Sequence, residues 1–131
     1  MKISFSSHRE EVLTAVQKAK RRALEVCGGT AERYAKENIT VNKSVISGNL
    51  RNSIAHEPED ENTELVGSTV EYAPYVELGH SQEPGRYVPK LGKRLVASWV
   101  DAKPFLRPAV ENHRQEYQRI IETELKKVGS K

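Results

Sequence analysis

The chain has 131 residues and contains little of what a large apolar core or a metal site requires. A single cysteine, Cys27, excludes an internal disulfide and cysteine-based metal spacings, and it favours a reducing compartment. No apolar run approaches the roughly 20 residues that span a membrane, so we expect no membrane contact. Aromatic residues make up only 6% of the chain, which predicts that neighbouring molecules complete part of its apolar surface.

Motifs of catalysis are also missing. The four histidines fall in four separate segments, and there is no Gly-rich phosphate loop, nucleophile elbow or H-E-x-x-H sequence. Glu77 and His80 have the spacing of an acid/base pair on one helical turn. The alternative is that Glu77 accepts hydrogen bonds from nearby backbone or pairs with a base such as Arg107. We therefore predict that the protein is not an enzyme and holds neither metal nor cofactor.

Charge is distributed unevenly along the chain, although the net charge is only +3. Residues 39–78 carry seven acidic and two basic side chains, whereas residues 79–131 carry eleven basic and six acidic ones. An acidic middle is poorly suited to wrapping nucleic acid and suits complementary protein surfaces. The basic run Lys18–Arg22 is interpreted as a solvated helix face, with phosphate binding as the alternative.

The first half of the chain predicts a long helix. Apolar residues recur at helical spacing over residues 12–39, and Ser6 or Ser7 is a plausible N-cap. Gly28 and Gly29 interrupt the pattern, but it resumes in phase after them. The sequence therefore predicts one helix that bends at the two glycines.

A short helix and an acidic hairpin follow. Ser47 can cap a helical turn that places Leu50 and Ile54 on one face, and Gly48 suggests a close backbone approach or a tight entry turn. Residues 54–59 and 64–70 read as two strands around the turn 60–63. Such a hairpin is marginal alone and needs a third strand or a covering helix.

The segment Tyr72–Gly79 is predicted to be the pivot between two halves of the fold. Pro74 favours the first turn of a helix and Gly79 supplies its end, so one helical turn is expected here, held by tyrosines under Phe105. A basic loop, 80–94, and a candidate strand, 94–100, come next.

The last element is predicted to be a long amphipathic helix. Pro104 and Pro108 are compatible with it only if the first precedes the helix and the second lies in its first turn. An apolar stripe then runs at helical spacing to Val128.

Three motifs, in this order, carry a family likeness: Gly48-x-Leu50-Arg51-x-Ser53-Ile54; Val66-Gly67 with Tyr72-Ala73-x-Tyr75-Val76-Glu77-x-Gly79; and Pro104-Phe105-Leu106-Arg107-Pro108-Ala109. In order and spacing the chain resembles the small tail-component family of long-tailed bacteriophages and prophages, which is encoded in the head–tail joining module. The family has a small hydroxyl residue after the glycine matched by Gly79, where this chain has His80.

The resemblance implies an α+β fold in one domain over residues 1–131. This would comprise a long N-terminal helix, a small antiparallel sheet of three to four strands with short helical turns, and a C-terminal helix packed on the sheet. It also implies a structural virion protein of the neck, made in the host cytoplasm and assembled as a hexameric or dodecameric ring around the DNA channel. The expected neighbours are the head connector or stopper and the tail-terminator or tail-tube proteins. A small basic nucleic-acid-binding module is the alternative.

Two sets of residues follow from these arguments. The candidate subunit or partner contacts are Glu59, Asp60, Glu61, Glu77, His80, Arg86, Lys90, Lys93 and Arg94. The structural motif residues are Gly48, Leu50, Ser53, Ile54, Tyr72, Tyr75, Gly79, Pro104, Phe105, Arg107 and Pro108. Because of their opposite charges, residues 57–64 of one subunit are expected to approach residues 86–94 of the next.

Overall fold

A single 34-residue helix, α1 (Arg9–Asn42), runs the length of the molecule's body. The computed structural model describes residues 9–42, 47–81, 87–89, 93–94 and 99–129. Helix α1 passes through Gly28 and Gly29 without interruption, which confirms the prediction of one helix. The candidate N-caps Ser6 and Ser7 lie outside the described residues.

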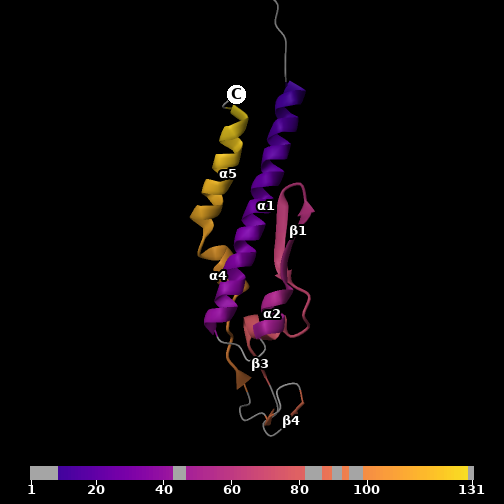
Figure 1. Cartoon of the computed structure of the whole chain (residues 1–131), viewed down its shortest axis with the longest axis vertical. Helices are drawn as coiled ribbons and strands as arrows, with labels where there is room; N and C mark the ends of the chain where they lie inside the picture. Colours follow the sequence, from indigo (N-terminus) through magenta and orange to yellow (C-terminus); the bar gives the residue numbers. More distant parts are fainter. Residues whose placement is uncertain (1–8, 43–46, 82–86, 90–92, 95–98, 130–131) are drawn as a thin grey trace, which may run out of the picture.

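The predicted hairpin lies along one side of α1, and the C-terminal helix lies along the other side (Figure 1). Strands β1 (Ile54–Asp60) and β2 (Thr63–Ser68) are antiparallel, with Ile54 opposite Ser68 and a register shift between Pro58 and Asp60. Both strands lie within two residues of their predicted limits. Helix α1 is the covering element that the hairpin needs.

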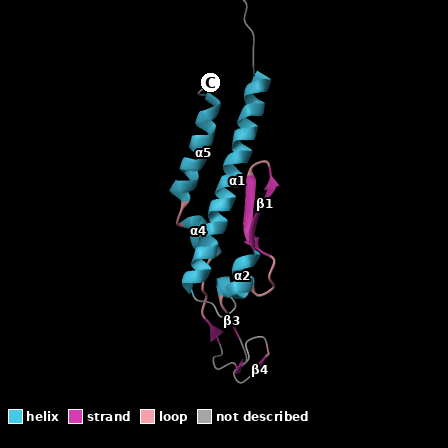
Figure 2. Ribbon diagram, viewed as in Figure 1, coloured by secondary structure: helices cyan, strands magenta, loops and turns pink. Residues whose placement is uncertain are grey.

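The predicted strand count is wrong. The sheet in the body has two strands, and the remaining strands are two-residue segments below it that pair among themselves (Figure 2). The expected loop 80–94 and strand 94–100 instead contain β3 (His80–Ser81), β4 (Tyr87–Val88), β5 (Lys93–Arg94) and β6 (Trp99–Val100). No third strand joins the hairpin among the described residues, and α1 covers its inner face instead.

The sequence predicted one continuous C-terminal helix, and this prediction is wrong. The region consists of two helices, α4 (Leu106–Glu111) and α5 (Arg114–Gly129). The N–H of Asn112 donates to the carbonyl of Pro108 at 3.0 Å and closes α4. At the break the ring of His113 stacks on the ring of Tyr34, with centroids 3.5 Å apart. This contact with α1 holds the chain at the point where it changes direction.

Helix α5 packs on α1 and not on the sheet, which corrects the predicted arrangement. The Sγ of Cys27 lies 3.8 Å from the carbonyl oxygen of Tyr117, and Arg22 pairs with Glu124 at 3.4 Å. The apolar stripe of α5 therefore meets the long helix, leaving the hairpin to contact a different face of α1.

The apolar core lies at the lower end of the body, where the three sequence motifs meet α1. There α2 (Ser47–Ser53), α3 (Ala73–Leu78) and α4 surround the last turns of the long helix. Its buried members are Ala35, Ile39, Leu50, Ile54, Ala73, Phe105 and Ala109. Each motif thus supplies at least one buried side chain. Among the described helices, none combines the length and hydropathy that a membrane span requires.

Candidate functional site

The pivot segment forms one short helix whose end depends on glycine. Helix α3 starts at Ala73 with Pro74 in its first turn, and Gly79 follows it with φ at 76°. Residues with a Cβ rarely adopt a positive φ, so glycine allows the chain to leave the helix here. This confirms the predicted roles of Pro74 and Gly79.

Glu77 binds the start of α4, and we call this set of contacts the Glu77 junction. Its carboxylate accepts hydrogen bonds from the backbone N–H of Phe105 at 2.7 Å, of Leu106 at 3.1 Å and of Arg107 at 2.9 Å. The N–H groups in the first turn of a helix have no partner within that helix, and the helix dipole favours a negative charge beside them. Glu77 supplies both the acceptors and the charge.

Further backbone contacts fasten the same region to α1 and α3. The N–H of Lys103 donates to the carbonyl of Val76 at 2.8 Å. From α1, the amide of Asn38 donates to the carbonyl of Phe105 at 3.1 Å. The amide of Asn42 donates to the carbonyls of Lys103 and Pro104. The two ends of segment 79–104 are therefore fixed to each other and to the long helix.

Two details of the predicted junction are corrected by the structure. Arg107 contacts Glu77 through its backbone N–H, whereas its guanidinium pairs with Glu111 at 3.6 Å. Tyr72 packs against the core as predicted, but Tyr75 is 56% exposed because it lies on the outer face of α3. Asn38 and Asn42 were not singled out in the sequence, since an asparagine on a helix carries no signal of a distant partner.

Residues 80–100 lie between the fixed ends, and we call them the ribbon arm. Of the strands described in it, β3 and β4 lie beyond the lower end of the body (Figure 1). His80 pairs with Val100 and Ser81 with Trp99, while Tyr87 pairs with Arg94 and Val88 with Lys93. Both pairings are antiparallel and nearly in one register. A register continued from His80 would place Tyr87 opposite Lys93, one residue from its observed partner.

Large apolar side chains are exposed where the ribbon arm leaves the body. Leu78 at the end of α3 is 72% exposed and Trp99 in β6 is 54% exposed. Solitary exposed apolar residues are ordinary, but an exposed tryptophan at the base of a projecting ribbon is typical of a contact surface. The expectation that neighbours complete part of the apolar surface stays a prediction.

The hairpin is held against α1 by a polar contact at Gly28. The Nδ1 of His56 lies 2.7 Å from a carboxylate oxygen of Glu64, and Arg21 of α1 pairs with the same carboxylate. A Cβ on Gly28 would lie 2.6 Å from Nδ1 of His56, closer than real Cβ contacts. Glycine is therefore required at position 28, and the point where a helix bend was predicted is a site of close approach between α1 and the hairpin.

The acidic tip of the hairpin is partly engaged with the basic run of α1. Arg21 donates to the carbonyl of Asp60 at 2.8 Å, and Lys20 donates to Asn62 at 2.6 Å. Lys18 and Arg22 are exposed, as the interpretation of a solvated face predicts, but for Lys20 and Arg21 that interpretation is wrong. The backbone N–H of Asn62 donates to the carboxylate of Asp60, and this bond is the main cause that lowers the pKa of Asp60.

The other candidate contact residues fall into two groups. Glu59 and Glu61 are exposed on the hairpin, and their role in a contact stays a prediction. Arg86 and Lys90 lie outside the described residues, and the structure describes only the backbone of His80, Lys93 and Arg94, in β3 and β5. The opposed acidic and basic segments thus belong to separate parts of the molecule, the hairpin and the ribbon arm.

The remaining motif residues are structural. The Oγ of Ser53 donates to the carbonyl of Leu50 at 2.6 Å and lies 2.5 Å from the Oγ of Ser68. It therefore joins α2 to β2. Pro104 precedes α4 and Pro108 is its third residue, as predicted. The close approach expected at Gly48 is absent, because a Cβ there would meet no atom within 4 Å among the described residues.

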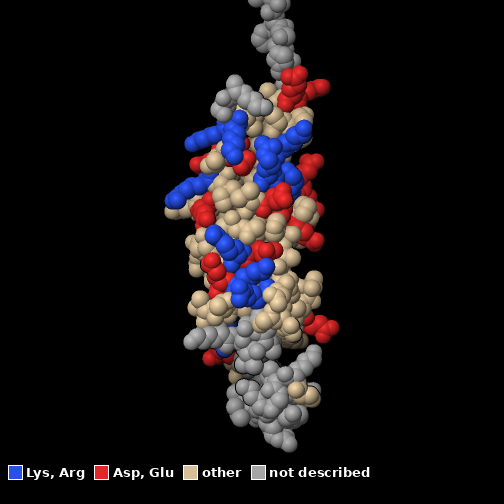
Figure 3. Space-filling view, in the orientation of Figure 1, with Lys and Arg blue, Asp and Glu red and all other residues tan. Residues whose placement is uncertain are grey.

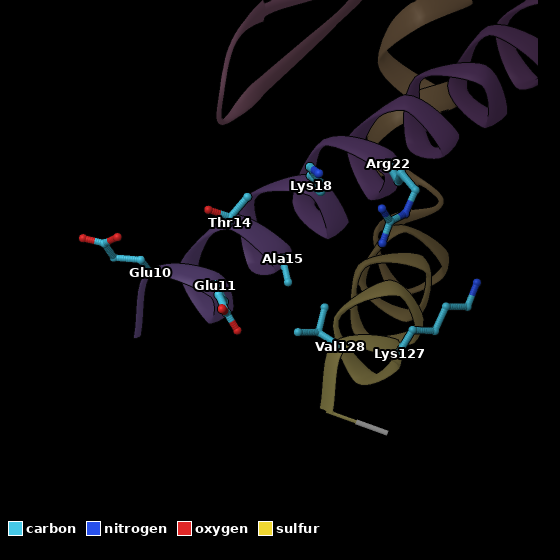
Figure 4. A pocket seen from close by; sticks show the side chains of 8 residues that line it. All are labelled: Glu10, Glu11, Thr14, Ala15, Lys18, Arg22, Lys127 and Val128. Atoms are coloured by element: carbon cyan, nitrogen blue, oxygen red, sulfur yellow. The ribbon is translucent and has the colours of Figure 1, made fainter. Parts of the chain in front are cut away.

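A cleft of about 660 Å³ opens between the first turns of α1 and the last turns of α5 (Figure 4). Ala15 and Val128 face the gap, whereas Glu10 points away from it. Acidic and basic side chains both line it, and no polar side chain among the described residues is fully buried. The cleft therefore lacks a polar group fixed in position to recognise a small ligand.

Charges of both signs are interspersed on the described part of the face shown in Figure 3. On the face shown in Figure 3, Lys and Arg gather over the upper half of α1 and along α5, and acidic side chains follow the edge where the hairpin lies. No cluster of three potential metal ligands occurs within the described ranges.

Comparison with protein families gives one match. Residues 5–79, more than half of the chain, match the HK97-gp10-like family model, described as "Bacteriophage HK97-gp10, putative tail-component". The match includes α1, the hairpin and Glu77. No curated protein and no solved structure matches the chain.

Proposed function

Because this chain belongs to the HK97-gp10-like family of bacteriophage tail components, we propose that it acts in the head–tail joining region of the virion. There it assembles as a homo-oligomeric ring of six or twelve copies around the DNA channel. It connects the head connector or stopper to the tail-terminator or tail-tube proteins. Its role is structural and requires neither catalysis nor a cofactor.

The observation that carries this proposal is the division of the chain into a firmly bonded body and a projecting arm. In the body, Glu77, Asn38 and Asn42 hold segment 103–107 through backbone hydrogen bonds. Beyond it, the described strands of the ribbon arm pair only with one another. A two-stranded ribbon alone is marginal in water, so a second molecule is needed to support it.

Ring closure requires two different surfaces on each subunit that fit each other. A head-to-tail contact between identical chains is heterologous, and it closes when the rotation between neighbours divides a full turn. The acidic hairpin and the basic residues 86–94 of the arm are such a pair. We propose that residues 57–64 of one subunit approach residues 86–94 of the next.

The test of function is a phage from which the gene has been deleted. The proposal predicts filled heads and complete tails that remain separate in the electron microscope, with joining restored by the wild-type gene. Joined particles of normal length in the deletion strain would contradict the proposal. Tails of abnormal length would instead place the protein at tail termination.

A second test concerns the ring itself. Light scattering and negative-stain imaging of particles or purified protein should reveal closed rings of six or twelve copies. Arg94→Glu should weaken assembly, most strongly at low salt where charges are least screened. Normal assembly of Arg94→Glu at low salt would remove the support for the charged contact, while leaving the position in the neck open to the deletion test.

A further inference from the structure

Gly67 occupies a strand position where the fold of the single chain does not require glycine. A Cβ added at Gly67 would meet no atom within 4 Å among the described residues, and its φ is not positive. Glycine in a strand interior weakens the strand, and it commonly marks a place where another backbone or a ligand approaches closely. No contact among the described residues therefore accounts for glycine at this position.

At Gly28, by contrast, contacts within the chain require glycine. There a Cβ would lie 2.6 Å from His56 and 2.7 Å from the Cγ of Glu64, so the hairpin itself excludes a side chain. Gly67 faces the opposite direction, on the outer surface of the same hairpin. Gly28 of α1 thus contacts the inner face of the hairpin, and Gly67 belongs to the hairpin's outer face.

The outer surface around Gly67 is hollowed and partly apolar. A depression of about 330 Å³ spans both strands and the segments that flank them. Gly67 pairs with Ala55, and Glu57 pairs with Leu65, which is 44% exposed. These four residues alternate with the inward-facing Ile54, His56 and Val66, so they share the outer face. We call this the Gly67 face.

The charge of the Gly67 face indicates what kind of surface could bind to it. Glu57 lies on it, Glu59 is exposed beyond it on the same strand, and no ion pair is found for either among the described residues. The ribbon arm carries Arg86, Lys90, Lys93 and Arg94, together with the strand residues Tyr87 and Val88. The basic ribbon arm needs a supporting surface. The Gly67 face is acidic and has room for a backbone, so the two are complementary.

We propose that the Gly67 face receives the ribbon arm of a second copy of this chain, whose backbone passes over Gly67. This rests on the proposed ring and names the surface through which its subunits join. The arm's bases meet Glu57 and Glu59, and its backbone fills the depression beside Leu65. The hairpin and the ribbon then become adjacent layers of one assembly.

The test uses Gly67→Val in the full-length chain, expressed in the deletion phage. Valine favours strands, so the purified variant should melt about 2–6 °C higher than the wild type. The same side chain would block the approach of a neighbour's backbone, so incorporation into particles should fall roughly tenfold or more, the effect of about 1.4 kcal/mol. Gly29→Ala is the matched control, because its Cβ would meet His56 at an ordinary 3.7 Å.

Two results would overturn the inference. Incorporation of Gly67→Val at the wild-type level would show that nothing approaches this face, and a lower melting temperature would show that the fold itself requires the glycine. Failure of the proposed function looks different, because the protein would then be incorporated elsewhere in the particle or not be needed for joining.

The identity of the occupant is tested by carbodiimide coupling of carboxylates to amines in assembled particles that contain isotopically light and heavy copies. A mixed-isotope peptide joining Glu57 or Glu59 to Lys90 or Lys93 supports a second copy. A link from these glutamates to a different virion protein, or to the arm within one chain, overturns it.

Discussion

The body of this protein and its ribbon arm differ in how their backbone groups are satisfied. At the Glu77 junction, one carboxylate accepts three N–H groups, and two asparagines of α1 bind the carbonyls beside them. In the arm, the described strands are two residues long and pair only with each other. In the proposed function, the body supplies the stability of the chain and the arm supplies its contact with other subunits.

If stability resides in the body, the largest loss should come from its core. Phe105 is completely buried, with 0% of its surface exposed to solvent, and it packs where all three motifs meet. Phe105→Ala should lower the free energy of unfolding by about 3–5 kcal/mol. Urea denaturation followed by circular dichroism measures this. A loss below 1 kcal/mol would show that the core lies elsewhere.

The Glu77 junction should be the next most sensitive point. Glu77→Ala leaves three N–H groups at the start of α4 without their acceptor, which should cost about 2–4 kcal/mol. Glu111→Ala is the control, because it removes only the exposed pair with Arg107 and should cost less than about 0.5 kcal/mol. Equal effects of the two substitutions in thermal melting would contradict the role of Glu77.

The two adjacent glycines of α1 should respond in opposite directions. Gly28→Ala forces His56 and Glu64 away from the helix and should destabilise the protein by about 1–3 kcal/mol. Gly29→Ala removes only the low helix propensity of glycine and should stabilise it by up to about 1 kcal/mol. Denaturant midpoints of the two variants, measured side by side, check the sign. A shared sign would mean that the hairpin does not approach α1 at Gly28.

Alkaline pH should weaken the contact between α4 and α5, where the hydroxyl of Tyr117 donates to the carbonyl of Ala109. Burial, the largest cause, and the charge of Glu116 raise the pKa of Tyr117 from 10.0 to about 12. A raised pKa means that stability contributed by the neutral phenol is complete below pH 10 and is lost as the pH rises toward 12. Tyr117→Phe should melt with a smaller decrease over this range than the wild type. Parallel curves for the two proteins would exclude Tyr117 as the cause.

The smallest effect on stability is expected in the ribbon arm. Arg94→Glu should change the free energy of unfolding by less than about 0.5 kcal/mol, the usual range for surface positions. The same variant should assemble less well, as proposed above. Thermal melting of the unassembled protein measures the first quantity. A loss as large as that of Glu77→Ala would mean that the arm is part of the body.

Much of the body could be predicted because its signals are local. Helical periodicity located α1, alternation around an acidic turn located the hairpin, and Pro74 with Gly79 limited α3. The role of Glu77 as a backbone acceptor was also foreseen as one alternative. Its actual partners lie 28 to 30 residues further along the chain, a distance that no local pattern encodes.

What could not be predicted depends on contacts between distant segments. The apolar stripe of the last helix continues across Asn112, so the sequence pattern does not show that the helix ends at Glu111. At this point His113 stacks on Tyr34 of α1, a contact between distant segments. Strand pairing in the arm was missed because two-residue strands are too short to show alternation. Gly28 was interpreted as a helix bend. The sequence could not show that His56, which lies on the hairpin, leaves no room for a side chain at this position.

The division between body and arm is tested most directly by replacing residues 80–100 with a short Gly-Ser turn. The melting temperature and the incorporation into particles are then measured on the same variant. The backbone bond from Lys103 to Val76 already holds the two ends together, so the body should melt within about 2 °C of the wild type. Incorporation should be abolished. A melting temperature that falls as far as that of Glu77→Ala, or normal incorporation without the arm, would contradict the account.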